Sequence, residues 1–190
     1  GESSRLQSGQ IFGSYDVFLS FRGEDMSKST FKDELYARLR QFEVNTFMDD
    51  DDGDHVELSF ELVKAIQVSR ISIIVFTENY ACSKWCLDKL VKVVDCGHLV
   101  LPVFYNFDPS EVRKQTGSFG TALAKHEEEF RGVEKVERWK AALTKVANLS
   151  GWHLENVAQR HESKFIQKIV EVVLWELNRK YMDVAKHPIG

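Results

Sequence analysis

The segment ISIIVFTENYACSKWCLDKLVKVVDCGHLVLPVFY, residues 71 to 105, decides the fold class. It begins and ends with near-continuous apolar runs of strand length, Ile71 to Phe76 and Leu99 to Tyr105. An apolar helical period lies between them, at Leu87, Leu90, Val91 and Val94. Strands that are apolar throughout and are joined by a helix indicate a parallel sheet covered on both faces. We therefore predict an α/β fold.

The same alternation continues on both sides of this segment. Upstream we predict strands at Tyr15 to Phe21 and Val44 to Met48, each followed by a helix, the first carrying Phe31, Leu35 and Leu39 and the second Leu58, Leu62, Ala65 and Ile66. Downstream we predict an irregular loop at Asp108 to Gly120, helices at about Thr121 to Phe130 and Trp139 to Ala147, a short strand within Asn148 to Leu154, and a last helix at about Ser163 to Lys180. Residues 1 to 13 lack any period, and we expect a flexible leader there.

Composition narrows the function classes. The chain of 190 residues suits one domain, and no apolar run approaches the roughly twenty residues that cross a bilayer. A net charge of −4 with dispersed basic residues disfavours nucleic acid. Cys82, Cys86 and Cys96 are too few for a disulfide framework, and with His98 they do not make a recognised zinc spacing. We expect a reducing compartment, no metal, buried cysteines and solvated lone histidines.

The loops after the first three strands are where a ligand is expected, since parallel sheets bind ligands beyond the carboxyl ends of their strands. In FRGED, Arg22 suits a phosphate, Gly23 a close backbone approach, and Glu24 and Asp25 the hydroxyls of a ribose. Alternatively, Asp25 or Ser27 caps the next helix while Arg22 pairs with Asp49 or a neighbouring acid. Both readings stay open.

A helix start is predicted at SKWCLDKL, residues 83 to 90, with Ser83 as its cap and Trp85 as an anchor beside the cleft. Taken alone, this pattern favours ordinary core packing over a role in a ligand site. The chain contains no GxxxxGK[ST], dinucleotide fingerprint or GxSxG elbow, so a kinase, dehydrogenase or α/β-hydrolase is not predicted.

A family resemblance extends over most of the chain. YDVFLSFRGED, SRISIIVFTENYACSKWCLDKLVKVV, VLPVFYNFDPSEVRKQTGSFG and RWKAALTKVANLSGWHL resemble, in this order, successive blocks of the plant TIR (Toll/interleukin receptor) domain of TIR-NB-LRR disease-resistance proteins. The resemblance implies a flavodoxin-like, five-stranded parallel sheet over residues 14 to 180, and a linker toward a nucleotide-binding domain at residues 181 to 190. It also implies self-association and, in many members, hydrolysis of NAD or NADP as substrate without a further cofactor.

Two departures from the family affect the implied catalytic site. Family enzymes carry a catalytic glutamate in WCLxEL, where this chain has Lys89, and the neighbouring Asp88 points about 100° around the helix. The loop after the second strand has Asp54 and His55 where an Arg-Gly pair is usual, so a side chain at His55 is expected to crowd the pocket.

Of the two implied self-association surfaces, one departs from the family pattern and the other matches it. Asp33 and Glu34 replace a Ser-His pair, which is expected to weaken the contact between first helices. Arg113, Lys114 and Gly151 match the second family interface, although Gly151 also fits a plain turn before Trp152.

The sequence thus predicts a cytoplasmic or nucleocytoplasmic signalling module that binds other TIR domains and has impaired NAD hydrolysis. The alternatives are an active NAD(P) nucleosidase, in which another carboxylate takes the lost role, and a nucleic-acid binder. The rest of the same chain, with nucleotide-binding and leucine-rich-repeat domains, is the other expected partner, and no membrane is expected.

Overall fold

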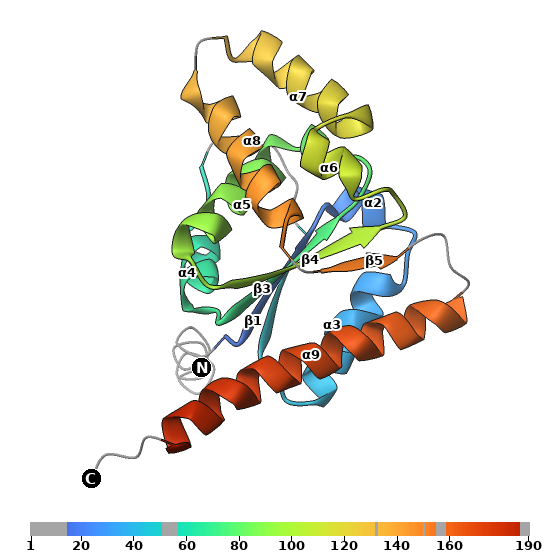
Figure 1. Ribbon diagram of the computed structural model, residues 1–190, viewed down its shortest axis with the longest axis vertical. Helices are drawn as coiled ribbons and strands as arrows, with labels where there is room; N and C mark the ends of the chain where they lie inside the picture. Colours follow the sequence, from blue (N-terminus) through green and yellow to red (C-terminus); the bar gives the residue numbers. More distant parts are fainter. Residues whose placement is uncertain (1–14, 51–56, 132, 150, 155–158, 187–190) are drawn as a thin grey trace, which may run out of the picture.

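The computed structural model describes residues 15–50, 57–131, 133–149, 151–154 and 159–186, with backbone alone for 152–154, 159–160 and 179–186 (Figure 1). The expected leader, His55 and the last four residues of the expected linker therefore lie outside the described residues. In chain order the elements are β1 (Val17–Phe21), α2 (Gly23–Met26), α3 (Phe31–Gln41), β2 (Thr46–Asp49), α4 (Phe60–Val68), β3 (Ile71–Phe76), the 3-10 turn η1 (Tyr80–Cys82), α5 (Lys84–Cys96), β4 (Leu99–Tyr105), α6 (Ser110–Lys114), α7 (Gly117–Glu129), α8 (Glu134–Ala147), β5 (Trp152–Leu154) and α9 (Gln159–Lys186).

The strands form one sheet in the order β2-β1-β3-β4-β5, and every neighbouring pair is parallel. This is the flavodoxin-like order of a doubly wound sheet. Ser20 of β1 stands opposite Asp49 of β2, and Phe21 stands opposite Val75 of β3. The carboxyl ends of these three strands therefore share one edge, where the loops that follow them meet.

Helices cover both faces of the sheet, as predicted (Figure 1). Along β1, Phe18 points into one hydrophobic cluster, while Val17 and Leu19 point into the other. The first cluster also holds apolar side chains of α4, α5, α7 and α8, and the second holds those of α3 and α9. The predicted α/β fold with a parallel sheet is confirmed.

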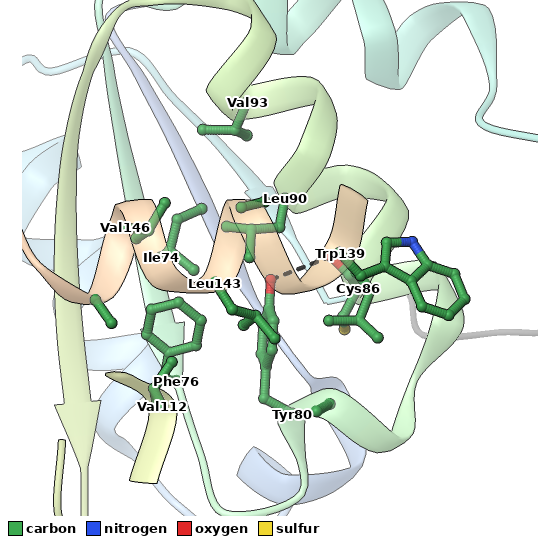
Figure 2. Packing of buried hydrophobic residues seen from close by; sticks show 14 of the residues in the cluster. Ile74, Phe76, Tyr80, Cys86, Leu90, Val93, Val112, Trp139, Leu143 and Val146 are labelled. Carbon is green, nitrogen blue, oxygen red and sulfur yellow. Dashed lines mark hydrogen bonds between the residues drawn. The ribbon is translucent and has the colours of Figure 1, made fainter. Parts of the chain in front are cut away.

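The core beneath α5 and α8 fixes the position of α5 on the sheet (Figure 2). Trp139 of α8 and Phe76 of β3 are fully buried there, beside Tyr80. The Tyr80 hydroxyl donates a hydrogen bond to the Cys86 carbonyl at 3.2 Å. Burial raises the pKa of Tyr80 well above its usual value, so this donor keeps its proton.

Several helices are longer than predicted. The expected loop at 108 to 120 contains α6 and the first turn of α7, separated by Gln115 in a left-handed conformation at φ 55°. The helices were predicted from the spacing of their apolar residues. Polar residues on the outer side of α7 and α8 do not show this spacing, so the first turns of both helices were not predicted. The last helix, α9, continues past Lys180 to Lys186, so the first residues of the expected linker are helical.

A proline lies where the pairing of the edge strand β5 begins. Its pairing with β4 starts opposite Val103, immediately after Pro102, which has no backbone N–H to donate. Gly151 precedes β5 at this point, and a Cβ built on it would lie 2.2 Å from the Pro102 carbonyl oxygen. The close approach of the two strands therefore depends on both residues.

Candidate functional site

The loops after β1 and β3 are joined by a polar network at the carboxyl edge of the sheet. The Arg22 guanidinium donates to Asp25 Oδ1 at 2.6 Å and to Glu24 Oε2 at 2.8 Å. The hydroxyl of Thr77, which directly follows β3, donates to the other oxygen of Asp25. Asp25 and Arg22 are mostly buried, whereas the Glu24 side chain is 73% exposed. Asp25 thus links two strand ends, and Glu24 faces solvent beside them.

This network tests the second explanation of FRGED, in which Arg22 pairs with an acid while Asp25 or Ser27 caps the next helix. Arg22 does pair with neighbouring acids, but its partners are Glu24 and Asp25. The capping part of that alternative is wrong, because the Ser27 hydroxyl donates to the Glu24 carbonyl and Ser29 Oγ accepts from Phe31 at the start of α3. Asp25 lies inside the short helix α2.

Gly23 is required by the protein's own backbone. A Cβ on Gly23 would lie 2.2 Å from the Asp50 carbonyl oxygen. The loops after β1 and β2 therefore pass within van der Waals contact of each other, and no larger residue fits between them. Sequence reasoning assigned this space to a ligand, because the approach of Asp50 has no local sequence signal.

Lys89 and Asp49 form a buried ion pair at the same edge. Lys89 Nζ lies 2.6 Å from Asp49 Oδ2, and their side chains are only 1% and 6% exposed. The ammonium also lies 5.3 Å from the centre of the Trp85 ring, a cation–π distance. Two charges removed from water in this way stabilise one another only with close geometry and hydrogen bonding, both of which are present.

The start of α5 directs Lys89 inward. Ser83 caps the helix by accepting from the Cys86 N–H at 3.1 Å, as predicted, and Leu87 and Leu90 are buried. Trp85 and Lys89 are four residues apart, so they share one helix face. Asp88 lies on another face, where it accepts from Trp139 Nε1 at 2.9 Å. The predicted divergence of Asp88 from Lys89 is confirmed.

Asp49 is the site residue whose role the sequence did not reveal. The sequence suggested it only as a partner of Arg22, whereas it is the last residue of β2 and contacts Lys89. The one available signal is the register, because parallel pairing places the last residue of β2 at the edge where α5 begins. His55 and Asp54 belong to the segment 51–56, outside the described residues.

The first expected interface is acidic. Asp33 and Glu34 of α3 line a hollow together with Thr30 and Glu162. Glu162 also accepts a hydrogen bond from the Tyr105 hydroxyl at 3.3 Å. Burial raises the pKa of Glu162, and the nearby Glu34 carboxylate adds to the rise. Negative charges are therefore concentrated where α3 meets α9.

The second expected interface combines exposed cations with a packed glycine. Arg113 and Lys114 are exposed at the end of α6, and Arg113 Nε donates to the Ala147 carbonyl at 2.9 Å. The explanation of Gly151 as a plain turn before Trp152 is incomplete, since Gly151 packs against Pro102 of β4.

The expectations for cysteine and histidine need correction. Cys86 is buried as expected, but Cys82 is exposed and Cys96 is partly buried. His126 is buried rather than solvated, and its Nε2 lies 2.8 Å from the Ala81 carbonyl oxygen. Within the described part of the chain, no group of three or more His, Cys, Asp and Glu side chains is placed to hold a metal ion. No helix there has both the length and the apolar character needed to span a membrane.

Comparison with known proteins gives the family. A family model described as the TIR domain matches residues 14–187. The chain belongs to the TIR domain family. This TIR domain is 49% identical over 180 residues to the disease resistance protein RPV1 of Vitis rotundifolia, and 47% identical over 183 residues to the TMV resistance protein N of Nicotiana glutinosa. Each alignment covers 93% of this chain but only 12% and 16% of the relatives, so the TIR domain spans a small part of their length.

Solved structures agree with the fold of this TIR domain. The TIR domains in the activated Roq1 resistosome, which directly recognises the pathogen effector XopQ, match with a TM-score of 0.75 and 47% identity over 83% of this chain and 98% of theirs. The heterodimer of the RPS4 and RRS1 TIR domains matches with a TM-score of 0.50 and 21% identity over 85% of this chain and 96% of that one, a likeness of fold alone.

Proposed function

We propose that this TIR domain is a signalling and self-association module of a plant immune receptor, and that it cleaves NAD or NADP far more slowly than glutamate-bearing relatives. The relatives named as disease resistance proteins, and the resistosome whose TIR domains it matches, support the receptor role. In the whole protein we expect nucleotide-binding and leucine-rich-repeat domains as further partners, and a cytoplasmic or nucleocytoplasmic location.

The Lys89–Asp49 ion pair carries the catalytic part of this proposal. Lys89 occupies the position of the glutamate in the family pattern WCLxEL, and its ammonium is turned inward and held by Asp49 at 2.6 Å. Cleavage of the nicotinamide–ribose bond builds positive charge on the ribose, which a carboxylate stabilises and an ammonium repels.

The size of this effect follows from Coulomb's law. At about 4 Å and an effective dielectric constant near 20, one unit charge pair contributes about 4 kcal/mol, so reversing its sign changes the barrier by up to about 8 kcal/mol. Asp49 neutralises part of the ammonium charge. Even half of the full effect slows turnover by about a thousandfold.

Nicotinamide release tests the proposal. The purified chain is incubated with NAD at high protein concentration, beside a plant TIR domain that carries the glutamate. We expect release at least about a hundredfold slower than from that relative, allowing for the partial neutralisation by Asp49. Equal rates would refute the catalytic part of the proposal while leaving the family assignment untouched.

An active nucleosidase is the second candidate. Glu24 supports it, because this carboxylate is 73% exposed at the same sheet edge, beside its partner Arg22. Under this candidate Glu24→Gln abolishes nicotinamide release, whereas under the leading proposal the substitution changes nothing measurable. Nucleic-acid binding is disfavoured by the net charge of −4, and a salt titration with labelled duplex DNA checks it.

A further inference from the structure

A small apolar hole lies between α5 and α8. Its cavity measures about 180 Å³, and Val91 and Val94 of α5 line it together with Ala141 and Ala142 of α8. An apolar protein cavity of about 150 Å³ accommodates a benzene ring. The hole therefore has the size of one aromatic side chain, and the outward-facing Ala141 leaves its mouth open.

The rim of the hole is charged. Arg138 and Lys145, one turn to either side of Ala141, are exposed on the α8 wall, and Asp95 stands on the α5 wall. Two cations and one carboxylate give the rim a net positive charge. A complementary partner therefore presents an apolar ring with carboxylates beside it.

Phe60 has these properties. It is the first residue of α4 and is 80% exposed, more than any other large hydrophobic side chain among the described residues. Glu57 and Glu61 flank it in the sequence, and both are exposed. A single exposed hydrophobic residue is ordinary on a protein surface, but the flanking carboxylates match the cationic rim in sign.

We infer that Phe60 of one copy inserts into the α5–α8 hole of a second copy, with Glu57 and Glu61 facing Arg138 and Lys145. Knob and hole lie on different helices, so the contact is heterologous and joins the copies head to tail. Burial of the exposed ring drives the association, and the opposite charges orient it. The inference deepens the proposed self-association by naming one surface for it.

Sedimentation velocity of the 190-residue chain over a series of rising concentrations tests the inference. Phe60→Ala removes the knob, and Ala141→Phe fills the hole with the protein's own ring. We expect each variant to weaken self-association by about tenfold or more, as truncation of an interface anchor does. A mixture of the two variants still holds one intact knob and one intact hole. The mixture should therefore form dimers and nothing larger.

Matched variants separate this surface from the others. Phe42→Ala removes a different phenylalanine, which is 50% exposed, and should leave association unchanged. Lys114→Ala addresses the interface expected from the family. The inference is overturned if the chain stays monomeric throughout the series, if Phe60→Ala and Ala141→Phe associate like the unmodified chain, or if their mixture gives no dimer. Loss of association in Lys114→Ala alone would refute the α5–α8 surface but keep the proposed self-association.

Discussion

At the scale of single residues, the central feature of this domain is the buried ion pair between Lys89 and Asp49. Neither side chain reaches solvent to any extent, so each charge depends on the other for stabilisation. Sequence analysis singled out Lys89, because the resemblance to the family implies a glutamate at this position. Its partner was not predicted, because Asp49 is one of several consecutive acids and only the strand register selects it.

The dependence of these charges on each other is measurable by urea unfolding. Lys89→Met removes the ammonium that faces the buried Asp49 carboxylate, and we expect the free energy of unfolding to fall by about 3–5 kcal/mol. Lys89→Met combined with Asp49→Leu removes both charges and should recover most of that loss. Lys84→Met, which removes an exposed pair with Glu129, serves as the control and should hardly move the midpoint. A double variant no more stable than Lys89→Met would mean that the two side chains act separately.

Gly151 gives a second test at this scale. A methyl group there meets the Pro102 carbonyl, so Gly151→Ala should lower the free energy of unfolding by about 1–3 kcal/mol through overpacking. Thermal melting monitored by circular dichroism measures the change. Lys114 belongs to the same expected interface but is exposed, so Lys114→Ala should melt at the same temperature as the unmodified chain. If the Gly151→Ala variant melts normally but associates less, Gly151 acts only in the interface and not in packing against Pro102.

At the scale of elements, the sequence predicted what the hydrophobic period specifies. The strands β1, β3 and β4 are buried throughout or nearly so, and they were predicted near their observed bounds. The helices α3 and α5 carry clear apolar faces, and they were predicted from these apolar positions. The short helix α6 and the first turns of α7 and α8 were missed, because polar residues facing solvent carry no period. The contacts of Gly23 and Gly151 were missed as well, since both involve segments far away in the sequence.

Glu162, which lies where α3 meets α9, leads to a prediction about how stability depends on pH. Burial, followed by the charge of Glu34, raises the pKa of Glu162 above its ordinary value of 4.5. A carboxyl with a higher pKa in the folded state stabilises the fold at low pH, and this contribution is lost as the pH rises through the folded-state pKa. Glu162→Gln should therefore flatten the fall of the unfolding free energy as the pH rises from about 4.5 toward neutrality.

Urea unfolding at a series of pH values checks this role of Glu162. Glu171→Gln, on the exposed side of the same helix, is the control and should leave the slope unchanged. An identical slope in Glu162→Gln and the unmodified chain would show that Glu162 titrates alike in the folded and unfolded states.

At the scale of the whole molecule, the chain has a TIR fold with a buried ion pair at the carboxyl edge of its sheet. The fold matches that of the Roq1 TIR domains, and the edge of β1, β2 and β3 holds the inward-facing Lys89. The proposal is that such a domain signals through assembly with other TIR domains, and that chemistry at this edge is slow. Phe60, the most exposed large apolar side chain among the described residues, then contributes to assembly rather than to catalysis.

The most direct test is nicotinamide release from NAD by the unmodified chain and by Lys89→Glu, at equal protein concentration and with circular dichroism showing that both are folded. We predict that Lys89→Glu raises the rate by about a hundredfold or more, because it replaces the ammonium with the carboxylate of the family pattern. Lys89→Gln, which removes the charge without supplying a carboxylate, should gain much less. Release by the unmodified chain as fast as by Lys89→Glu would contradict the account.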